Sequence, residues 1–365
     1  MSRKFDRRTF LRTGALAGLT FAAGCSGGGG DGGSDGGGGD GGSDGGGGGD
    51  GGSGDDGDNG DGESMDTETE MESSGPPLAA LSIPSLEFTF FTRMENAFEQ
   101  AKSNGDIAQD STFFDAQNSQ STQVSDVETA LTNGIDFLMI SPVTADGIVP
   151  AIQQANEQGV PVIAIDRNIG EGAERATYVA SDNVSLGQRS TNLLLEFMTE
   201  AADADSYNVV QLEGTQGASV TNERGEGFQN AVDENDNLNR LASQTGEFST
   251  QTALNVMEDF ITQYGDEIHG VFCQNDLMAL GAHQALQNND MSMPITGIDG
   301  SEAWVQLFGD NEFYGTIAQL PEEMVNSAIA RGTDVLAGES VEDTYAIDGL
   351  EVTQENASDY LDSYF

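Results

Sequence analysis

Short apolar runs alternate with longer stretches of helical spacing along most of the chain, and this alternation constrains the fold more than any other feature. The apolar runs have the length of strands and lie at residues 111–116, 135–141, 160–166, 208–213, 271–274, 295–299 and 314–318. Helical spacing fills the gaps, as at 183–202, 250–264 and 276–287. Continuous apolar strands separated by helices indicate parallel sheets covered on both faces. With right-handed crossovers they make doubly wound units. The sequence therefore predicts an α/β fold, and its length favours two such units over one.

Residues 26–77 have a composition that cannot support a folded core. This tract is almost entirely Gly, Asp, Ser and Glu, so it cannot bury enough surface to offset the entropy of ordering it. A flexible tract of about fifty residues has a root-mean-square reach of roughly 40 Å. Calcium binding by the Gly-Asp repeats is the alternative, since calcium prefers oxygen ligands. The repeat spacing fits neither a helix-loop-helix calcium loop nor a β-roll, so we interpret the tract as a disordered acidic linker.

The first 25 residues carry the pattern of an export signal that ends in a lipid anchor. The arginine pair Arg7-Arg8 precedes Phe10-Leu11, as in signals of the twin-arginine type. An apolar run follows at 14–24, well short of the roughly 20 residues that span a bilayer. Small residues stand directly before Cys25, as at the processing site of a prokaryotic lipoprotein. A short buried helix is the alternative. We predict that lipidated Cys25 anchors the protein to the outer face of the cytoplasmic membrane.

The chain is strongly acidic, with 13 Lys and Arg against 62 Asp and Glu. Residues 1–25 hold five of the basic residues and one acid, and 26–77 hold fourteen acids, which leaves eight basic and 47 acidic residues from 78 onward. Such a surface should repel nucleic acid, which is bound through Lys and Arg. Its self-repulsion is screened in molar salt, where the Debye length is about 3 Å. We therefore expect a halophilic protein that loses compactness when salt is removed.

The sequence contains no recognisable catalytic or metal-binding pattern. Cys273 lies in an apolar run without a partner cysteine, so a buried thiol is expected and no disulfide. The two histidines, His269 and His283, lie outside the polar ends of the predicted strands. No nucleophile elbow, phosphate loop or zinc spacing occurs. We predict that the protein is not an enzyme and uses neither a metal nor a cofactor.

Polar side chains follow four of the predicted strands directly. They are Ser141, the pair Asp166 and Arg167, the pair Asn275 and Asp276, and Asp299. The carboxyl ends of the strands line the ligand crevice in open α/β sheets. Each of these residues alone could instead cap the helix that follows. Their recurrence at four strand ends predicts a site for a polar small molecule.

Several longer stretches carry a recognisable pattern in a fixed order. They are Phe90-Phe91 before a helix, VIAIDR at 162–167, ASDN at 180–183, ERGEGF at 223–228, LNVM at 254–257, QNDLMALG at 274–281, GIDG at 297–300 and TIAQLP at 316–321. In this order they resemble the sugar-binding proteins of ABC importers, in the ribose-binding type of the periplasmic binding protein family. The resemblance covers residues 78 to about 348.

The resemblance implies two Rossmann-like α/β lobes joined by a three-crossing hinge, the type I periplasmic binding protein fold. The crossings would fall near 181–182, 319–320 and 347–348. The N-terminal lobe would comprise 78–181 plus 320–347, and the C-terminal lobe 182–319 plus 348–365. In that family the two lobes close around a sugar, and the resemblance implies a monomer.

The resemblance also implies a set of ligand-binding residues. The polar members are Asp166, Arg167, Asn275, Asp299 and Gln319, and the aromatic members are Phe90, Phe91 and Phe248. Carboxylates accept hydrogen bonds from vicinal hydroxyls and arginine donates in a fork. Phenyl rings cover the C–H faces of a sugar ring, although plain core packing is the alternative for each Phe.

Three positions depart from the ribose-binding pattern. Phe88 stands where ribose binders carry an Asn, Ser141-Pro142 stands in place of their Asn-Pro, and Asn222 is aligned with their second pocket arginine. Ser141 and Asn222 are therefore included in the expected site. The expected ligand is a ribose-like monosaccharide, with a deoxygenated sugar, another pentose or hexose, another polyol or a nucleoside as alternatives.

These features together predict a lipid-anchored receptor that captures a sugar by lobe closure and delivers it to an ABC permease. A sensor that presents the closed form to a membrane signalling protein is the alternative, because it needs the same closed form. A transcriptional repressor with the same lobes would need a basic helix-turn-helix at its N-terminus, where this chain has an export signal.

Overall fold

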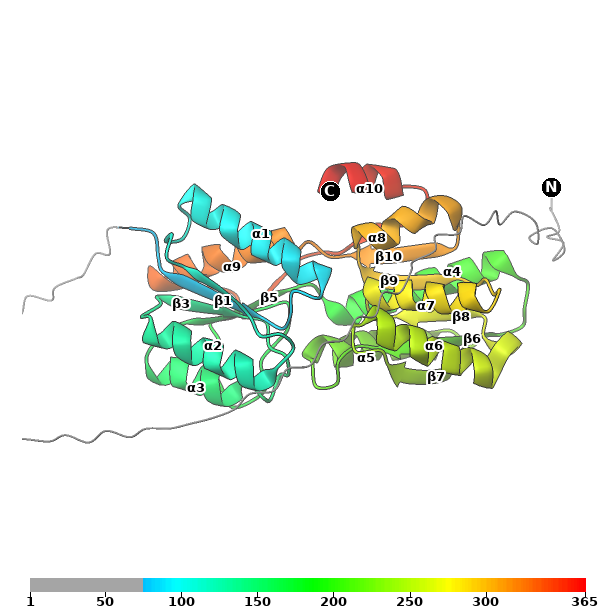
Figure 1. Cartoon of the computed structure of the whole chain (residues 1–365), viewed down its shortest axis with the longest axis horizontal. Coiled ribbons are helices and arrows are strands. Elements are labelled where there is room, and N and C mark those ends of the chain that lie inside the picture. Colours follow the sequence, from blue (N-terminus) through cyan, green and yellow to red (C-terminus); the bar gives the residue numbers. More distant parts are fainter. Residues whose placement is uncertain (1–74) are drawn as a thin grey trace, which may run out of the picture. The chain divides into compact units, whose positions relative to one another are not determined.

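Two six-stranded sheets flanked by helices make up residues 75–365, the part of the chain that this computed structural model describes (Figure 1). The predicted signal, the lipidation site Cys25 and nearly all of the predicted linker lie outside the described residues. Among the described helices, none is long and apolar enough to cross a membrane.

The first sheet has the strand order β11-β5-β4-β3-β1-β2, and all its pairings are parallel. We call this sheet with its helices the first lobe. Its elements are β1 (Ala79–Ile83), α1 (Thr89–Asn104), β2 (Thr112–Asp115), α2 (Gln120–Thr132), β3 (Phe137–Ile140), α3 (Val149–Glu157), β4 (Val162–Ile165), β5 (Thr177–Ala180), α9 (Pro321–Leu336) and β11 (Thr344–Ala346).

The second sheet has the order β12-β10-β9-β8-β6-β7 and, with its helices, forms the second lobe. Its pairings are parallel except that β12 runs antiparallel to β10. The elements are α4 (Asn183–Ala201), β6 (Tyr207–Glu213), α5 (Ser219–Glu234), β7 (Leu238–Thr245), α6 (Thr250–Tyr264), β8 (Gly270–Cys273), α7 (Asp276–Asn288), β9 (Ile295–Asp299), α8 (Glu302–Val305), β10 (Tyr314–Ala318), β12 (Leu350–Val352) and α10 (Ala357–Tyr364), with short 3-10 turns at Gly265–Glu267 and Gln306–Asp310.

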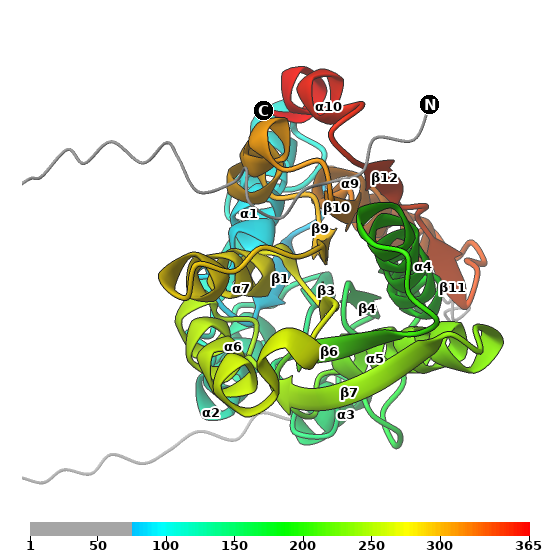
Figure 2. The same cartoon turned by 90° about the vertical axis from the view of Figure 1, so that its right-hand side faces the viewer.

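Alternate residues of the central strands pack into different apolar clusters, which is the physical reason both faces of each sheet carry helices. In β6, Val210 and Leu212 join the cluster that contains residues of α6 and α7, whereas Tyr207 and Val209 join the cluster formed with α4. Figure 2 accordingly shows α6 and α7 on one face of this sheet and α4 on the other. The predicted fold class, two doubly wound α/β lobes, is confirmed.

The chain passes between the two sheets three times, after β5, after β10 and after β11. Each predicted strand run overlaps an observed strand, but β1, β5, β7, β11 and β12 were not predicted. Sheet-edge position explains three of these omissions. β7 is largely exposed or half-buried, and β11 and β12 are three residues long and mostly exposed. Such strands lack a continuous apolar run because they are not buried on both faces.

Candidate ligand-binding site

A cavity lies where residues of the two lobes meet, at the carboxyl ends of the strands. Asp166 directly follows β4, Asp299 ends β9, and Gln319 directly follows β10. The full lining is Phe88, Phe90, Phe91, Asp166 and Arg167 from the first lobe, Val220, Arg224, Phe248, Asn275 and Asp299 from the second, and Gln319 at a chain crossing.

Most of the site residues expected from the sequence are brought together in this cavity. Those that line it are Phe90, Phe91, Asp166, Arg167, Phe248, Asn275, Asp299 and Gln319. Ser141 and Asn222 do not line it. Two lining residues, Val220 and Arg224, were not expected, and a third, Phe88, was expected only as a departure from the ribose-binding pattern.

In the first lobe, neighbouring groups fix the position of the Asp166 side chain. Ser141 Oγ donates to Asp166 Oδ2 over 3.2 Å, and the Tyr178 hydroxyl donates to the backbone oxygen of Asp166 over 2.6 Å. Asp166 has a φ of 61°, a left-handed backbone conformation that is uncommon outside glycine and found often at functional sites. Ser141, which was expected in the pocket, does not line the cavity: it is fully buried and supports Asp166 from behind.

Arg167 joins the polar part of the cavity to its aromatic part. Its Nε lies 3.7 Å from Asp166 Oδ2, and its guanidinium carbon lies 5.6 Å from the ring centre of Phe91 and 5.3 Å from that of Phe248. The latter contact crosses between the lobes. These are cation–π distances. Within residues 75–365, Arg167 Nε has no hydrogen-bond partner, so it is a buried donor beside the cavity.

In the second lobe, Arg224 is the arginine of the cavity, and only 3% of it is exposed. Its Nε donates to Asn183 Oδ1 over 2.9 Å, its Nη1 donates to the backbone oxygen of Gln274 over 2.6 Å, and Nη1 lies 3.6 Å from Asp299 Oδ1. Helix α5, which carries Arg224, packs tightly on α4. A Cβ atom at Gly227 would lie 2.1 Å from the backbone oxygen of Val184.

Asn222, which was expected in the pocket, does not line the cavity and is exposed on α5. An α-helix turns about 100° per residue, so Asn222 and Arg224, two positions apart, point to nearly opposite sides. Val220 and Arg224 are four positions apart and share the face that lines the cavity. Arg224 is the single basic residue of α5, which is the signal in the sequence that could have identified it.

The remaining polar lining residues make partial use of their hydrogen-bonding groups. Gln319 Nε2 donates to Asp299 Oδ1 over 2.8 Å, while Gln319 Oε1 is buried and has no partner in the described part of the chain. Asn275 Oδ1 caps α7 by accepting from the backbone N–H of Met278 over 3.0 Å. Asn275 therefore caps the helix and also lines the cavity, two roles that the sequence offered as alternatives.

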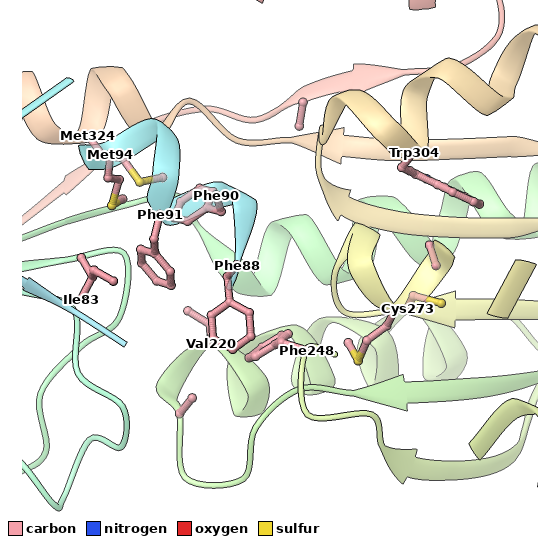
Figure 3. Packing of buried hydrophobic residues seen from close by; sticks show 14 of the residues in the cluster. Ile83, Phe88, Phe90, Phe91, Met94, Val220, Phe248, Cys273, Trp304 and Met324 are labelled. Carbon is pink, nitrogen blue, oxygen red and sulfur yellow. The ribbon is translucent and has the colours of Figure 1, made fainter. Parts of the chain in front are cut away.

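Aromatic rings from both lobes form the apolar wall of the cavity. The ring centres of Phe88 and Phe248 are 6.2 Å apart in an edge-to-face arrangement. The ring centres of Phe88 and Phe91 are also 6.2 Å apart. Figure 3 shows Phe88 and Phe248 facing each other across the lobe boundary, with Val220 beside them. Phe248 has a φ of 54°, and a Cβ atom at Gly214 would lie 1.9 Å from Phe248 Cζ, so this ring position requires glycine there.

The charges in the cavity are balanced, with one carboxylate and one guanidinium from each lobe. Burial raises the pKa of Asp166 and raises that of Asp299 to about 6. The loss of hydration raises each pKa by more than the attraction of the nearby arginines lowers it. Burial lowers the pKa of Arg167 to about 10. Because the opposite charges offset each other, the site suits a neutral ligand with several hydroxyl groups better than an ion.

Comparison with known proteins places the chain among extracytoplasmic binding proteins. Residues 79–340 match the family described as the periplasmic binding protein domain. The ribose import binding protein of Bacillus subtilis is 36% identical over 265 residues, which is 72% of this chain and 83% of that protein. The Escherichia coli ribose import binding protein is 33% identical over 74% of this chain and 88% of its own length. The arabinose-binding protein of an ABC transporter from Shewanella, solved with L-arabinofuranose, superposes with a TM-score of 0.73 at 26% identity, over 78% of this chain and 95% of that one.

The different placements of Arg224 and Asn222 predict opposite effects on stability. Arg224→Ala removes one partner from a buried charge network and should lower the free energy of unfolding by about 3–5 kcal/mol. Asn222→Ala should raise it slightly, by no more than about 0.7 kcal/mol, because Ala favours an exposed helix. Denaturant unfolding in molar KCl measures both values. Equal losses in the two variants would contradict this description of α5.

Proposed function

The chain belongs to the periplasmic binding protein domain family, and we propose that it captures a ribose-like monosaccharide outside the cytoplasm and delivers it to an ABC permease. The family and its ribose-importing relatives make it a solute-binding protein and not an enzyme. The observation that carries the choice of ligand is the charge-balanced cavity between the lobes, which both polar and aromatic side chains line.

The arrangement of donors and acceptors supports binding by lobe closure. Asp166 and Asp299 would accept hydrogen bonds from ligand hydroxyls, and Arg167 and Arg224 would donate to ligand oxygens. Each lobe contributes one acid and one arginine. A ligand that forms hydrogen bonds with all four of these side chains is therefore bound to both lobes. Such a ligand stabilises the closed state.

Direct contacts between the lobes beside the cavity also fit a closed form. The backbone N–H of Asn168, in the first lobe, donates to Ser219 Oγ in the second over 2.9 Å. The backbone N–H of Ala145 donates to the backbone oxygen of Gly217 over 3.0 Å. These bonds would form only when the lobes approach.

The ligands of similar proteins support a single sugar ring. The ribose import binding proteins and the arabinose-binding protein that resemble this chain are named for monosaccharides. A monosaccharide or a cyclic polyol is therefore favoured over a nucleoside or an oligosaccharide. Phe88 and Val220 extend the apolar wall, so the ligand is expected to turn a C–H face or edge toward them.

A ligand screen by thermal unfolding tests the proposed function. The panel is D-ribose, L-arabinose, D-galactose, xylitol, myo-inositol and uridine, in molar KCl. A ligand at a hundred times its Kd adds about 2.7 kcal/mol of stability, which shifts the midpoint by several degrees. We expect a shift with at least one monosaccharide and none with uridine. No shift with any sugar would contradict the proposal. Without ligand, the midpoint should fall at low salt if the acidic composition reflects a halophilic protein.

The raised pKa of Asp299 predicts that sugar binding weakens in acid. Ligand hydroxyls would prefer the ionised carboxylate, so affinity should be constant above pH 7 and fall below about pH 6, by at most about tenfold per pH unit. Without ligand, the same shift acts on stability in the opposite sense. The contribution of this carboxyl is fully present below its unfolded pKa of about 3.9 and is lost as the pH rises through about 6.

Calorimetric titration with the best sugar of the panel, from pH 5 to pH 8, measures this dependence. Asp299→Asn should bind weakly and lose most of the acid-dependent decline, because the titrating group is gone. An affinity of the unaltered protein that stays constant down to pH 5 would refute the role given to Asp299.

We further propose that lipid on Cys25 anchors the protein to the membrane and that the acidic tract tethers the binding domain. This proposal is supported by the sequence, in which an arginine pair, an apolar run, small residues and a cysteine follow one another in that order. Cys25→Ser in the exporting cell should move the protein from the membrane fraction to the soluble one. Cys273→Ser is the matched control, because Cys273 is fully buried, and it should stay in the membrane fraction. Equal fractionation of both variants would argue against the anchor.

A further inference from the structure

Behind the cavity lies a buried carboxylate to which the proposed function gives no role. Asp276 is the first residue of α7 and directly follows the cavity residue Asn275. It is 0% exposed and does not line the cavity. A buried carboxylate is costly unless it accepts hydrogen bonds, so its partners indicate what it does.

The hydrogen bonds of Asp276 go to the turn that follows Asp299 and to the strand beside it. Asp276 Oδ2 accepts from the backbone N–H of Ser301 over 2.6 Å. Asp276 Oδ1 accepts from Thr316 Oγ1 on β10 over 2.8 Å. Thr316 Oγ1 in turn accepts from the backbone N–H of Gly300 over 3.4 Å. One side chain of α7 therefore secures the two residues that follow Asp299.

This turn needs external support because its backbone is strained. Asp299 has a φ of 121° and Gly300 has a φ of 74°. A positive φ is unfavourable for a residue with a Cβ atom, and it persists only where the surroundings enforce it. Without the Ser301 and Thr316 contacts, Asp299 could relax to an ordinary conformation and turn its carboxylate away from the cavity.

The packing around Asp276 leaves little room for the turn to shift. A Cβ atom at Gly297 on β9 would lie 2.2 Å from Asp276 Oδ1. A Cβ atom at Gly300 would lie 2.3 Å from the Tyr360 hydroxyl and 2.4 Å from Ala318 Cβ. Glycine at both positions allows β9 and its turn to lie directly against α7 and β10.

We propose that Asp276 is a positioning residue, which holds the 299–301 turn so that Asp299 presents its carboxylate to the ligand. Asp276 acts through Asp299 and does not touch the ligand. Because Gln319 Nε2 donates to Asp299 Oδ1, the same support fixes the Gln319 amide. The inference rests on the proposed function, since it assigns Asp299 to sugar binding.

A double-mutant cycle tests this role in the full chain. Asp276→Ala, Asp299→Asn and the double variant are titrated in molar KCl with the panel monosaccharide that binds the unaltered protein most tightly. Asp276→Ala should weaken binding about tenfold or more in the unaltered background. In the Asp299→Asn background the same change should cost less than about twofold, because residues that act through one group are not additive.

A conservative variant and a surface variant complete the experiment. Asp276→Asn keeps an acceptor for Ser301, and Thr316 can rotate its hydroxyl, so binding should stay within about threefold of the unaltered protein. Asp290→Asn removes the same charge from an exposed site just beyond α7 and should leave the affinity unchanged. If Asp276→Ala does not fold, Thr316→Val removes one of the two contacts and should show the same dependence on Asp299, with a smaller loss.

The outcomes separate this inference from the proposed function. If Asp276→Ala leaves sugar binding intact, or weakens it equally in both backgrounds, the positioning role is overturned and the proposed function stands. An unaltered protein that binds no monosaccharide of the panel refutes the proposed function and the inference together. A loss that depends on Asp299 and is restored by Asp276→Asn supports the inference.

Discussion

Buried charges between the lobes can exist only where each meets an opposite charge or a hydrogen-bonding partner, and much of the site is organised around this constraint. Arg224 meets Asn183, the backbone of Gln274 and Asp299. Asp166 meets Ser141 and Arg167. Because these partners come from different strands and helices, the position of each charge depends on the packing of the whole lobe. The two lobes supply equal and opposite charges, which makes their junction suitable for a neutral ligand with many hydroxyl groups.

The site is also where the backbone departs from ordinary conformations. Asp166, Phe248 and Asp299 all have positive φ and all line the cavity. Strain of this kind must be balanced by the surrounding structure. The groups that balance it are buried and close by, such as Tyr178 beside Asp166 and Asp276 behind the turn after Asp299. The support of the site therefore extends one layer deeper than the residues that line the cavity.

Sequence patterns identified the strands that are buried on both faces and the polar residues at their ends. The carboxyl ends of parallel strands converge, so Asp166, Asn275 and Asp299 could be assigned to one site before any geometry was known. Residues on helices were harder to place. Asn222 and Arg224 stand two positions apart, and only the orientation of α5 against α4 decides that Arg224 faces the cavity. Ser141 was placed at the correct strand end, but it supports Asp166 from behind.

The sequence alone determined the α/β class and the polar side chains at the strand ends, because periodicity and strand ends are local properties of the chain. The resemblance to the binding-protein family supplied the two-lobed arrangement, the Phe residues of the cavity and Gln319. Only the tertiary structure decided which side chains face the cavity and which support them, since that depends on how helices pack and turns are held. Asp276 illustrates the difference. In the sequence it resembles an ordinary residue in the first turn of a helix, and its contacts with Ser301 and Thr316 join segments that are far apart along the chain.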